Sequence, residues 1–134
     1  MAKLDWLTAR PIAHRGLHDA SAIENTGTAF SAAMADGYAI ETDLQISADG
    51  EAMVHHDDAF GRLTEGNGRL AEMNAAEIRT VRFNSGTDRI LTLNELCELV
   101  AGRATMVIEL KSQLNDDRRL VRRTAEVLAK YKGP

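Results

Sequence analysis

Side chains that can do chemistry cluster in four short motifs of this sequence, each at the end of an apolar run. In chain order the motifs supply His14-Arg15, Glu41 with Asp43, His56-Asp57, and Glu109 with Lys111. Carboxylates are hard ligands for divalent cations, imidazoles titrate near neutral pH, and cationic side chains bind anions. Together these residue types predict a metal-assisted reaction on an anionic substrate such as a phosphoester.

The three acidic side chains are the candidate metal ligands. Glu41 and Asp43 are two residues apart, as are Glu109 and Lys111, so each pair shares one face of a strand. Three carboxylates that meet repel one another unless a cation lies among them, and oxygen ligands favour Mg²⁺ or Ca²⁺ over zinc. We therefore expect Glu41, Asp43 and Glu109 to hold a divalent cation. Arg15 and Lys111 would add positive charge beside it, which suits a phosphate.

The histidines are the candidate proton-transfer groups. One imidazole can take a proton from a nucleophile while another protonates a leaving oxygen. The local pattern does not distinguish His55 from His56. Each motif alone is also typical of ordinary structure, namely an exposed strand acid, a same-face ion pair or a hydrogen-bonded histidine. Their joint occurrence at strand ends favours the chemical interpretation.

Composition limits the class of protein. The chain has 134 residues, 44% apolar and 27% charged, which predicts a single soluble globular domain over residues 1–134. A net charge of −4 argues against a nucleic-acid partner. The longest uncharged stretch, residues 25–35, is too short for a transmembrane segment. With no visible export signal and only Cys97 as a thiol, we expect a cytoplasmic protein.

Alternating strands and helices should position the four motifs. The pattern predicts strands over 11–14, 38–46, 52–56 and 105–111, and helices over 25–37, 92–102 and 116–131. Asn25 is the expected cap of the first helix, and residues 58–90 are expected to form a surface excursion. This order favours a mainly parallel sheet with crossover helices. In α/β proteins of this kind, sites lie at the carboxyl ends of the strands.

The motifs also resemble a known family in their residues, order and spacing. They are Ala13-His14-Arg15-Gly16, Glu24-Asn25-Thr26, Ile40-Glu41-Thr42-Asp43-Leu44, Asp49-Gly50, Val54-His55-His56-Asp57, Arg62-Leu63-Thr64 and Ile108-Glu109-Leu110-Lys111. Taken together, from Pro11 to Lys111, they resemble the glycerophosphodiester phosphodiesterases. No single tripeptide among them is specific.

The resemblance implies an α/β fold of the TIM-barrel type and hydrolysis of a glycerophosphodiester to an alcohol and glycerol 3-phosphate. By the same resemblance, His14 and His56 match the general acid and base, and His56 is preferred over His55 on that ground alone. The metal ligands would be Glu41, Asp43 and Glu109, and the phosphate contacts Arg15 and Lys111. The cation would be Mg²⁺ or Ca²⁺, and the partner a small-molecule phosphodiester.

The number of strands sets a further expectation. A complete (β/α)₈ barrel takes about 250 residues, so this chain should contain about the first four strands. An open half-barrel would leave two strand edges and apolar strand residues exposed, which predicts a homo-oligomer. Two alternatives remain open at this stage. One is a catalytically silent, self-associating half-barrel, and the other is a related phosphodiesterase that acts on lysophospholipids.

Overall fold

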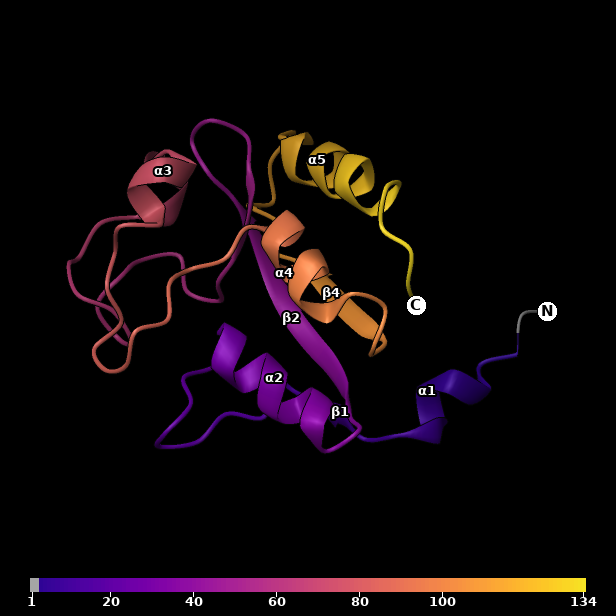
Figure 1. The fold of residues 1–134 in the computed structure, drawn as a ribbon. Helices are drawn as coiled ribbons and strands as arrows, with labels where there is room; N and C mark the ends of the chain where they lie inside the picture. The colour runs from indigo at the N-terminus through magenta and orange to yellow at the C-terminus, as the bar shows by residue number, and fades with distance from the viewer. Residues whose placement is uncertain (1–2) are drawn as a thin grey trace.

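The computed structural model describes residues 3–134, which are built around one four-stranded sheet (Figure 1). The strands are β1 (Ile12–Ala13), β2 (Ala39–Ile46), β3 (Ala52–Val54) and β4 (Met106–Leu110). The helices are α1 (Asp5–Ala9), α2 (Gly27–Ala35), α3 (Ala75–Ile78), α4 (Leu93–Val100) and α5 (Arg119–Leu128), with a 3₁₀ turn, η1, at Leu70–Glu72. Every predicted strand and long helix is present, whereas α1 was not expected.

Strand β2 is the centre of the sheet. It runs parallel to β1, with Ala13 opposite Ile40, and parallel to β4, with Asp43 opposite Glu109. Backbone groups of successive strand residues point to opposite edges. The amide of Ala39 bonds to Pro11 and the carbonyl of Asp43 accepts from His55, so β1 and β3 lie along one edge of β2 and β4 along the other.

The third strand corrects the prediction of four consecutive barrel strands. β3 pairs antiparallel to β2, with Leu44 opposite Val54, so only β1, β2 and β4 run parallel. The reason is the short connection, because parallel neighbours need a crossover of a dozen or more residues. Here the chain turns at Gly50 with φ of 85° and goes directly back along β2.

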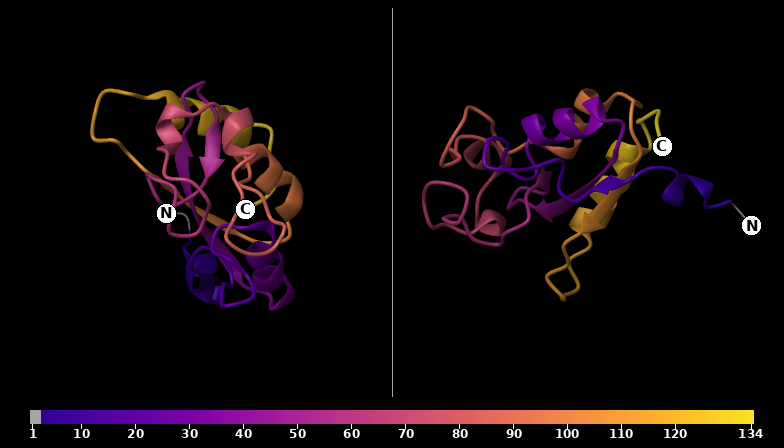
Figure 2. Two further views of the ribbon diagram at one scale, coloured as in Figure 1. Left: turned by 90° about the vertical axis from the view of Figure 1, so that its left-hand side faces the viewer. Right: turned by 90° about the horizontal axis from the view of Figure 1, so that it is seen from below.

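Three helices cover one face of the sheet. Figures 1 and 2 show α2, α4 and α5 on the same side of β2 and β4. Ile40 and Leu44 of β2 pack there against Phe30 of α2, Leu96 of α4 and Leu120 of α5. The predicted alternation along β2 is therefore confirmed for its apolar side chains, and the helices of the same chain already bury them.

The segment 58–90 adds no strand to the sheet, but it is more than a surface loop. Its apolar side chains Leu70, Ile78, Phe83 and Ile90 form a second small core with Met53 of β3. The short helix α3 begins with a capping box between Asn74 and Glu77, as its sequence predicts. The segment therefore packs against the hairpin that carries the second histidine motif.

Two local predictions are wrong. The N-cap of α2 is Thr26, whose hydroxyl accepts from the amide of Ala29, while Asn25 lies one residue outside with φ of 56°. The apolar residues of the helix predicted over 116–131 would also place Val121 on its inner face, but Val121 of α5 is 56% exposed. Gly37 ends the α2 region with φ of 74°, as predicted.

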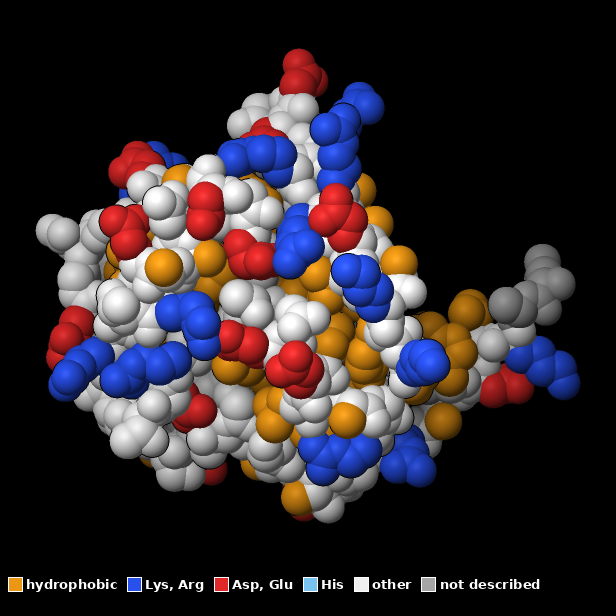
Figure 3. Space-filling model, turned by 45° about the horizontal axis from the view of Figure 1, so that its top comes forward, with side chains coloured by type: hydrophobic (Ala, Val, Ile, Leu, Met, Phe, Trp, Pro, Cys, Tyr) orange, Lys and Arg blue, Asp and Glu red, His pale blue; other side chains and the backbone are white. Residues whose placement is uncertain are grey.

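Apolar surface remains near the N-terminus. Trp6 and Leu7 of α1 and Ile12 of β1 are exposed, and Figure 3 shows apolar side chains gathered around this N-terminal region.

Within residues 3–134 no helix has the length and apolarity needed to cross a membrane. Self-association stays a prediction, and it now depends on the outer edges of β1 and β4 and on this patch rather than on the apolar residues of β2.

Candidate active site

The three predicted metal ligands lie together on the face of the sheet opposite the helices. Glu41, Asp43 and Glu109 each offer a carboxylate oxygen, and these oxygens lie within 4.8 Å of one another. The parallel register puts Asp43 directly opposite Glu109, and alternation along β2 puts Glu41 on the same face. Asp43 is only 1% exposed, whereas the Glu109 side chain is 55% exposed. These three carboxylates, the acidic trio, are therefore buried at Asp43 and open to solvent at Glu109.

Asp43 is held by Asn25, which the sequence predicts as a helix cap. Asn25 donates from Nδ2 to Asp43 Oδ2 over 2.9 Å, and its Oδ1 accepts from the Thr42 hydroxyl over 2.9 Å. Its left-handed backbone, which asparagine adopts more readily than most residues, turns the side chain towards β2. Helical periodicity predicts Asn25 only as a cap. In the sequence, its link to the site is indicated only by its place in the Glu24-Asn25-Thr26 motif.

Arg15 and Lys111 lie beside the carboxylates. The backbone amide of Arg15 donates to Glu41 over 3.0 Å, and its guanidinium Nε lies 3.3 Å from Asp43. Lys111 Nζ lies 3.1 Å from Glu109 and 3.5 Å from Asp43. Burial alone would lower the pKa of Lys111, but the hydrogen bonds and charges of Glu109 and Asp43 raise it overall. Three carboxylates and two cations leave one net negative charge, which a divalent cation would reverse.

His14 is the first residue after β1 and is exposed. Extending the β1–β2 register by one residue places it beside Glu41. The His18 ring is its neighbour, at 6.5 Å between centroids. The structure thus locates His14 at the carboxyl end of β1, next to the acidic trio.

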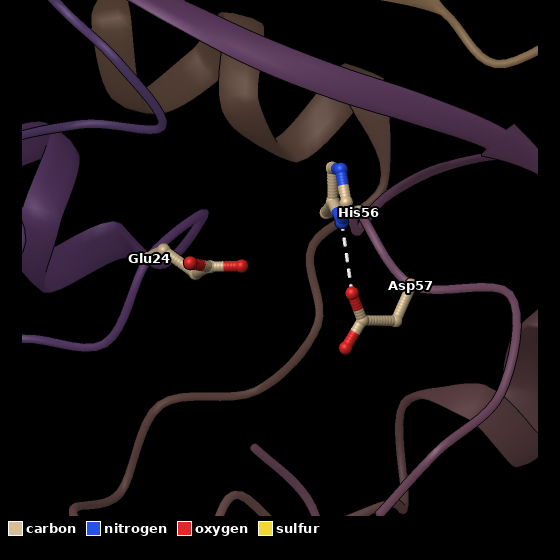
Figure 4. Close-up of side chains that lie close together, drawn as sticks. All are labelled: Glu24, His56 and Asp57. Carbon is tan, nitrogen blue, oxygen red and sulfur yellow. Dashed lines mark hydrogen bonds and ion pairs between the residues drawn. The ribbon is translucent and has the colours of Figure 1, made fainter. Parts of the chain in front are cut away.

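The two consecutive histidines after β3 have opposite environments. His55 is buried against the rings of Phe60 and Phe83, at 5.6 and 6.5 Å, and burial lowers its pKa to about 4. The His56 side chain is 29% exposed, and its Nδ1 lies 2.8 Å from Asp57 Oδ1 (Figure 4). Of the two, His56 is the one a substrate can reach.

Arg62 joins this histidine to the rest of the site, a role that sequence reasoning missed. Its Nε donates to Asp57 over 2.7 Å, and its Nη2 also pairs with the buried Glu24. Arg62 lowers the pKa of Asp57 to about 2 by hydrogen bonding. Burial raises the pKa of Glu24, but Arg62 and Arg15 outweigh it and lower that pKa. Although Glu24, His56 and Asp57 lie close together (Figure 4), the guanidinium already supplies the cation for these two carboxylates.

Known proteins are similar to this chain in sequence and in fold. Residues 14–132 match the model of the glycerophosphoryl diester phosphodiesterase family. The chain belongs to this family. The glycerophosphodiester phosphodiesterase of Caldanaerobacter subterraneus is 39% identical over an alignment of 111 positions that covers 75% of this chain and 44% of that protein. Glycerophosphodiester phosphodiesterase 1 of Bos taurus is 35% identical over 75% of this chain and 33% of its own length.

Solved structures of glycerophosphodiester phosphodiesterases and related enzymes have the same fold. An Oleispira antarctica phosphodiesterase, in complex with the product sn-glycerol-3-phosphate, matches 96% of this chain with a TM-score of 0.82 and 28% identity. The Thermotoga maritima glycerophosphodiester phosphodiesterase matches 91% with a TM-score of 0.74 and 28% identity. The chain covers 55% and 50% of these two structures, so it spans half or less of most of the relatives described. The predicted family and the α/β class with a parallel sheet are confirmed.

Proposed function

We propose that this chain carries the metal-binding and acid–base groups of an enzyme that hydrolyses glycerophosphodiesters to an alcohol and glycerol 3-phosphate. Membership of the family supports the reaction class. The observation that carries the proposal is the convergence of Glu41, Asp43 and Glu109 within 4.8 Å, beside Arg15 and Lys111. The glycerol 3-phosphate held by the Oleispira antarctica enzyme agrees with this substrate class.

The acidic trio fits a divalent cation. All three donors are hard oxygens on adjacent parallel strands, and Asp43 is oriented by Asn25 before any ion binds. Glu41, Asp43 and Glu109 would hold Mg²⁺ or Ca²⁺, which would neutralise charge that develops on the phosphoryl oxygens.

The protein's own groups account for the remaining chemistry. Lys111 and Arg15 would orient the phosphate through their positive charges. One of His14 and His56 would remove the proton of the glycerol 2-hydroxyl as it attacks phosphorus, and the other would protonate the departing alcohol oxygen. Water would then open the resulting cyclic phosphate to give glycerol 3-phosphate. His55 is unsuited to this work because it is buried and its pKa is about 4.

The first experiment tests the metal. The 134-residue chain is assayed for release of glycerol 3-phosphate from glycerophosphocholine, with Mg²⁺, with Ca²⁺ and with EDTA. We expect EDTA to abolish hydrolysis, either ion to restore it, and Glu41→Gln to weaken the ion's effect. Full activity in chelator would overturn the metal role. A metal-loaded chain that hydrolyses nothing would favour the silent half-barrel, and preferential cleavage of lysophosphatidylcholine would favour the lysophospholipid alternative.

The second experiment tests the acid and base. His14→Ala and His56→Ala should each lower turnover by about 10²–10⁴-fold, because each removes one proton transfer. His18→Ala is the matched control, since His18 is also exposed and lies close to His14. A His56→Ala chain that turns over at the wild-type rate would contradict the assignment.

A further inference from the structure

We propose that Asp57 is a positioning residue that fixes the His56 imidazole through Nδ1 and leaves Nε2 free to exchange a proton with the substrate. The catalytic meaning of this inference rests on the proposed function. The orientation of the ring does not, because it follows from contacts within the chain.

The first observation is the direction of the contact. Asp57 Oδ1 lies 2.8 Å from His56 Nδ1, and Figure 4 shows the other ring nitrogen turned away from Asp57. An ionised carboxylate can only accept hydrogen bonds. The proton in this contact must therefore sit on Nδ1 of His56. In the neutral ring the lone pair is then on Nε2, which is the arrangement of a histidine base held by a carboxylate.

The second observation is that Asp57 is itself immobilised. Arg62 binds both of its carboxylate oxygens, from Nε over 2.7 Å and from Nη2 over 3.1 Å. The planar guanidinium suits such two-point recognition. The same Arg62 pairs with Glu24, and Glu24 accepts from Arg15 over 3.1 Å. Asp57 is thus anchored, through Arg62 and Glu24, to the residue that also contacts the acidic trio.

The third observation concerns the backbone on either side of His56. Gln45 at the end of β2 donates from Nε2 to the carbonyl of His55 over 2.9 Å and to that of Asp57 over 2.8 Å. The amide of His55 donates to the carbonyl of Asp43 over 3.1 Å. The segment 55–57 is therefore bound to the strand that carries two of the metal ligands.

Other charged groups near His56 do not compete with Asp57 for its ring. Glu24 and Asp57 each offer a carboxylate oxygen within 4.8 Å of a His56 ring nitrogen, and Arg62 pairs with both carboxylates. Glu24 already accepts from both Arg15 and Arg62. The donors of Arg62 are directed at carboxylates. Asp57 is thus the group that the structure provides to orient the ring.

The test is the protonation site of His56, measured by long-range ¹H–¹⁵N correlation spectra of the ¹⁵N-labelled 134-residue chain at a pH where the ring is neutral. We expect the proton on Nδ1 in the wild-type protein. In Asp57→Asn the amide can present its NH₂ group, so Nδ1 becomes an acceptor and the proton moves to Nε2. Asp58→Asn, at the exposed next residue, should leave the ring on its wild-type tautomer.

Two results would overturn the proposal without any measurement of activity. One is a wild-type His56 that carries its proton on Nε2, and the other is an unchanged tautomer in a folded Asp57→Asn chain. The backbone amide spectrum of the same sample reports whether the variant is folded. The protonation site measured in the wild-type chain can refute the proposal by itself. The test is therefore decisive even if the Asp57→Asn variant does not fold.

Kinetics then test what the orientation does. Asp57→Asn should lower kcat by about 10²-fold or more, with KM changed little, because the tautomer matters at the proton-transfer step. Asp58→Asn should retain wild-type kcat. A shifted tautomer with unchanged kcat would refute the positioning role. If the wild-type chain hydrolyses no diester, the proposed function fails, whereas the tautomer result still decides the structural inference.

Discussion

Replacement of His55 by glutamine should remove the part of the pH dependence of stability between pH 7 and pH 5 that comes from this buried ring. His55 is 2% exposed, and burial lowers its pKa from 6.5 to about 4, despite the attraction of Asp57 and Glu24. As the pH falls below 6.5, the unfolded chain binds a proton at this residue and the folded chain does not. Wild-type stability therefore falls as the pH drops from 6.5 towards 4.

The magnitude follows from the two pKa values. His55 has a pKa of 6.5 in the unfolded chain and about 4 in the folded chain. Its titration therefore lowers the free energy of unfolding by about 2 kcal/mol between pH 7 and pH 5. Urea unfolding of wild-type and His55→Gln chains at both pH values measures this difference. Carboxylates and the other histidines titrate in both chains, so subtraction isolates His55. Equal pH dependence in the two chains would refute the assignment of His55 as a buried, neutral histidine.

Three further predictions concern stability and metal binding. Gly16→Ala should destabilise the fold by several kcal/mol, since φ is 81° and a Cβ would lie 2.8 Å from the Ala29 backbone. Gly50→Ala is the control, because φ is 85° there but the space around it is open, and it should cost only about 1 kcal/mol. Urea unfolding measures both changes. Thr26→Ala should cost about 1 kcal/mol through loss of the α2 cap. Ca²⁺ or Mg²⁺ should raise the Tm of the wild-type chain and raise it less in Glu41→Gln, and equal shifts in a thermal scan would contradict the ligand assignment.

The acidic face of β2 could be predicted because strand side chains alternate with a period of two. Once Ile40 and Leu44 are assigned to the core, Glu41 and Asp43 must face the other way. The parallel pairing with β4 then follows from a crossover through a helix, and it brings Glu109 alongside. Local pattern and simple topology thus determine where the candidate metal ligands lie.

The contacts that orient these ligands could not be predicted in the same way. Asn25 reaches Asp43 across 18 residues, and Arg62 reaches Glu24 across 38. Helical periodicity places Asn25 only as a cap, and Arg62 lies in a segment without helical or strand periodicity, so the loop path decides which side chains they meet. The direction of β3 was missed for a different reason, because the length of the connection and not the strand pattern determines it.

The consecutive histidines show how environment separates residues of the same type. His55 uses its ring to fill an apolar cluster and its amide to bond to β2, so it anchors the segment and stays neutral. His56 follows directly after this buried residue. Its Nδ1 contacts Asp57, and its other ring nitrogen does not. A histidine that exchanges protons must keep one nitrogen in a fixed direction, and a mobile loop alone would not provide this. The buried histidine therefore helps to hold its neighbour in the orientation that the proposed catalysis requires.

Arg15 contacts both groups of charged residues in the site. Its guanidinium contacts Asp43 in the acidic trio and Glu24 in the group around Arg62. From Glu24 the contacts continue through Arg62 and Asp57 to His56. The two groups are therefore linked by ion pairs between side chains rather than only through the backbone. Because Arg15 pairs with a candidate metal ligand and with the carboxylate that binds Arg62, its replacement is expected to disturb both the acidic trio and the contacts that lead to His56.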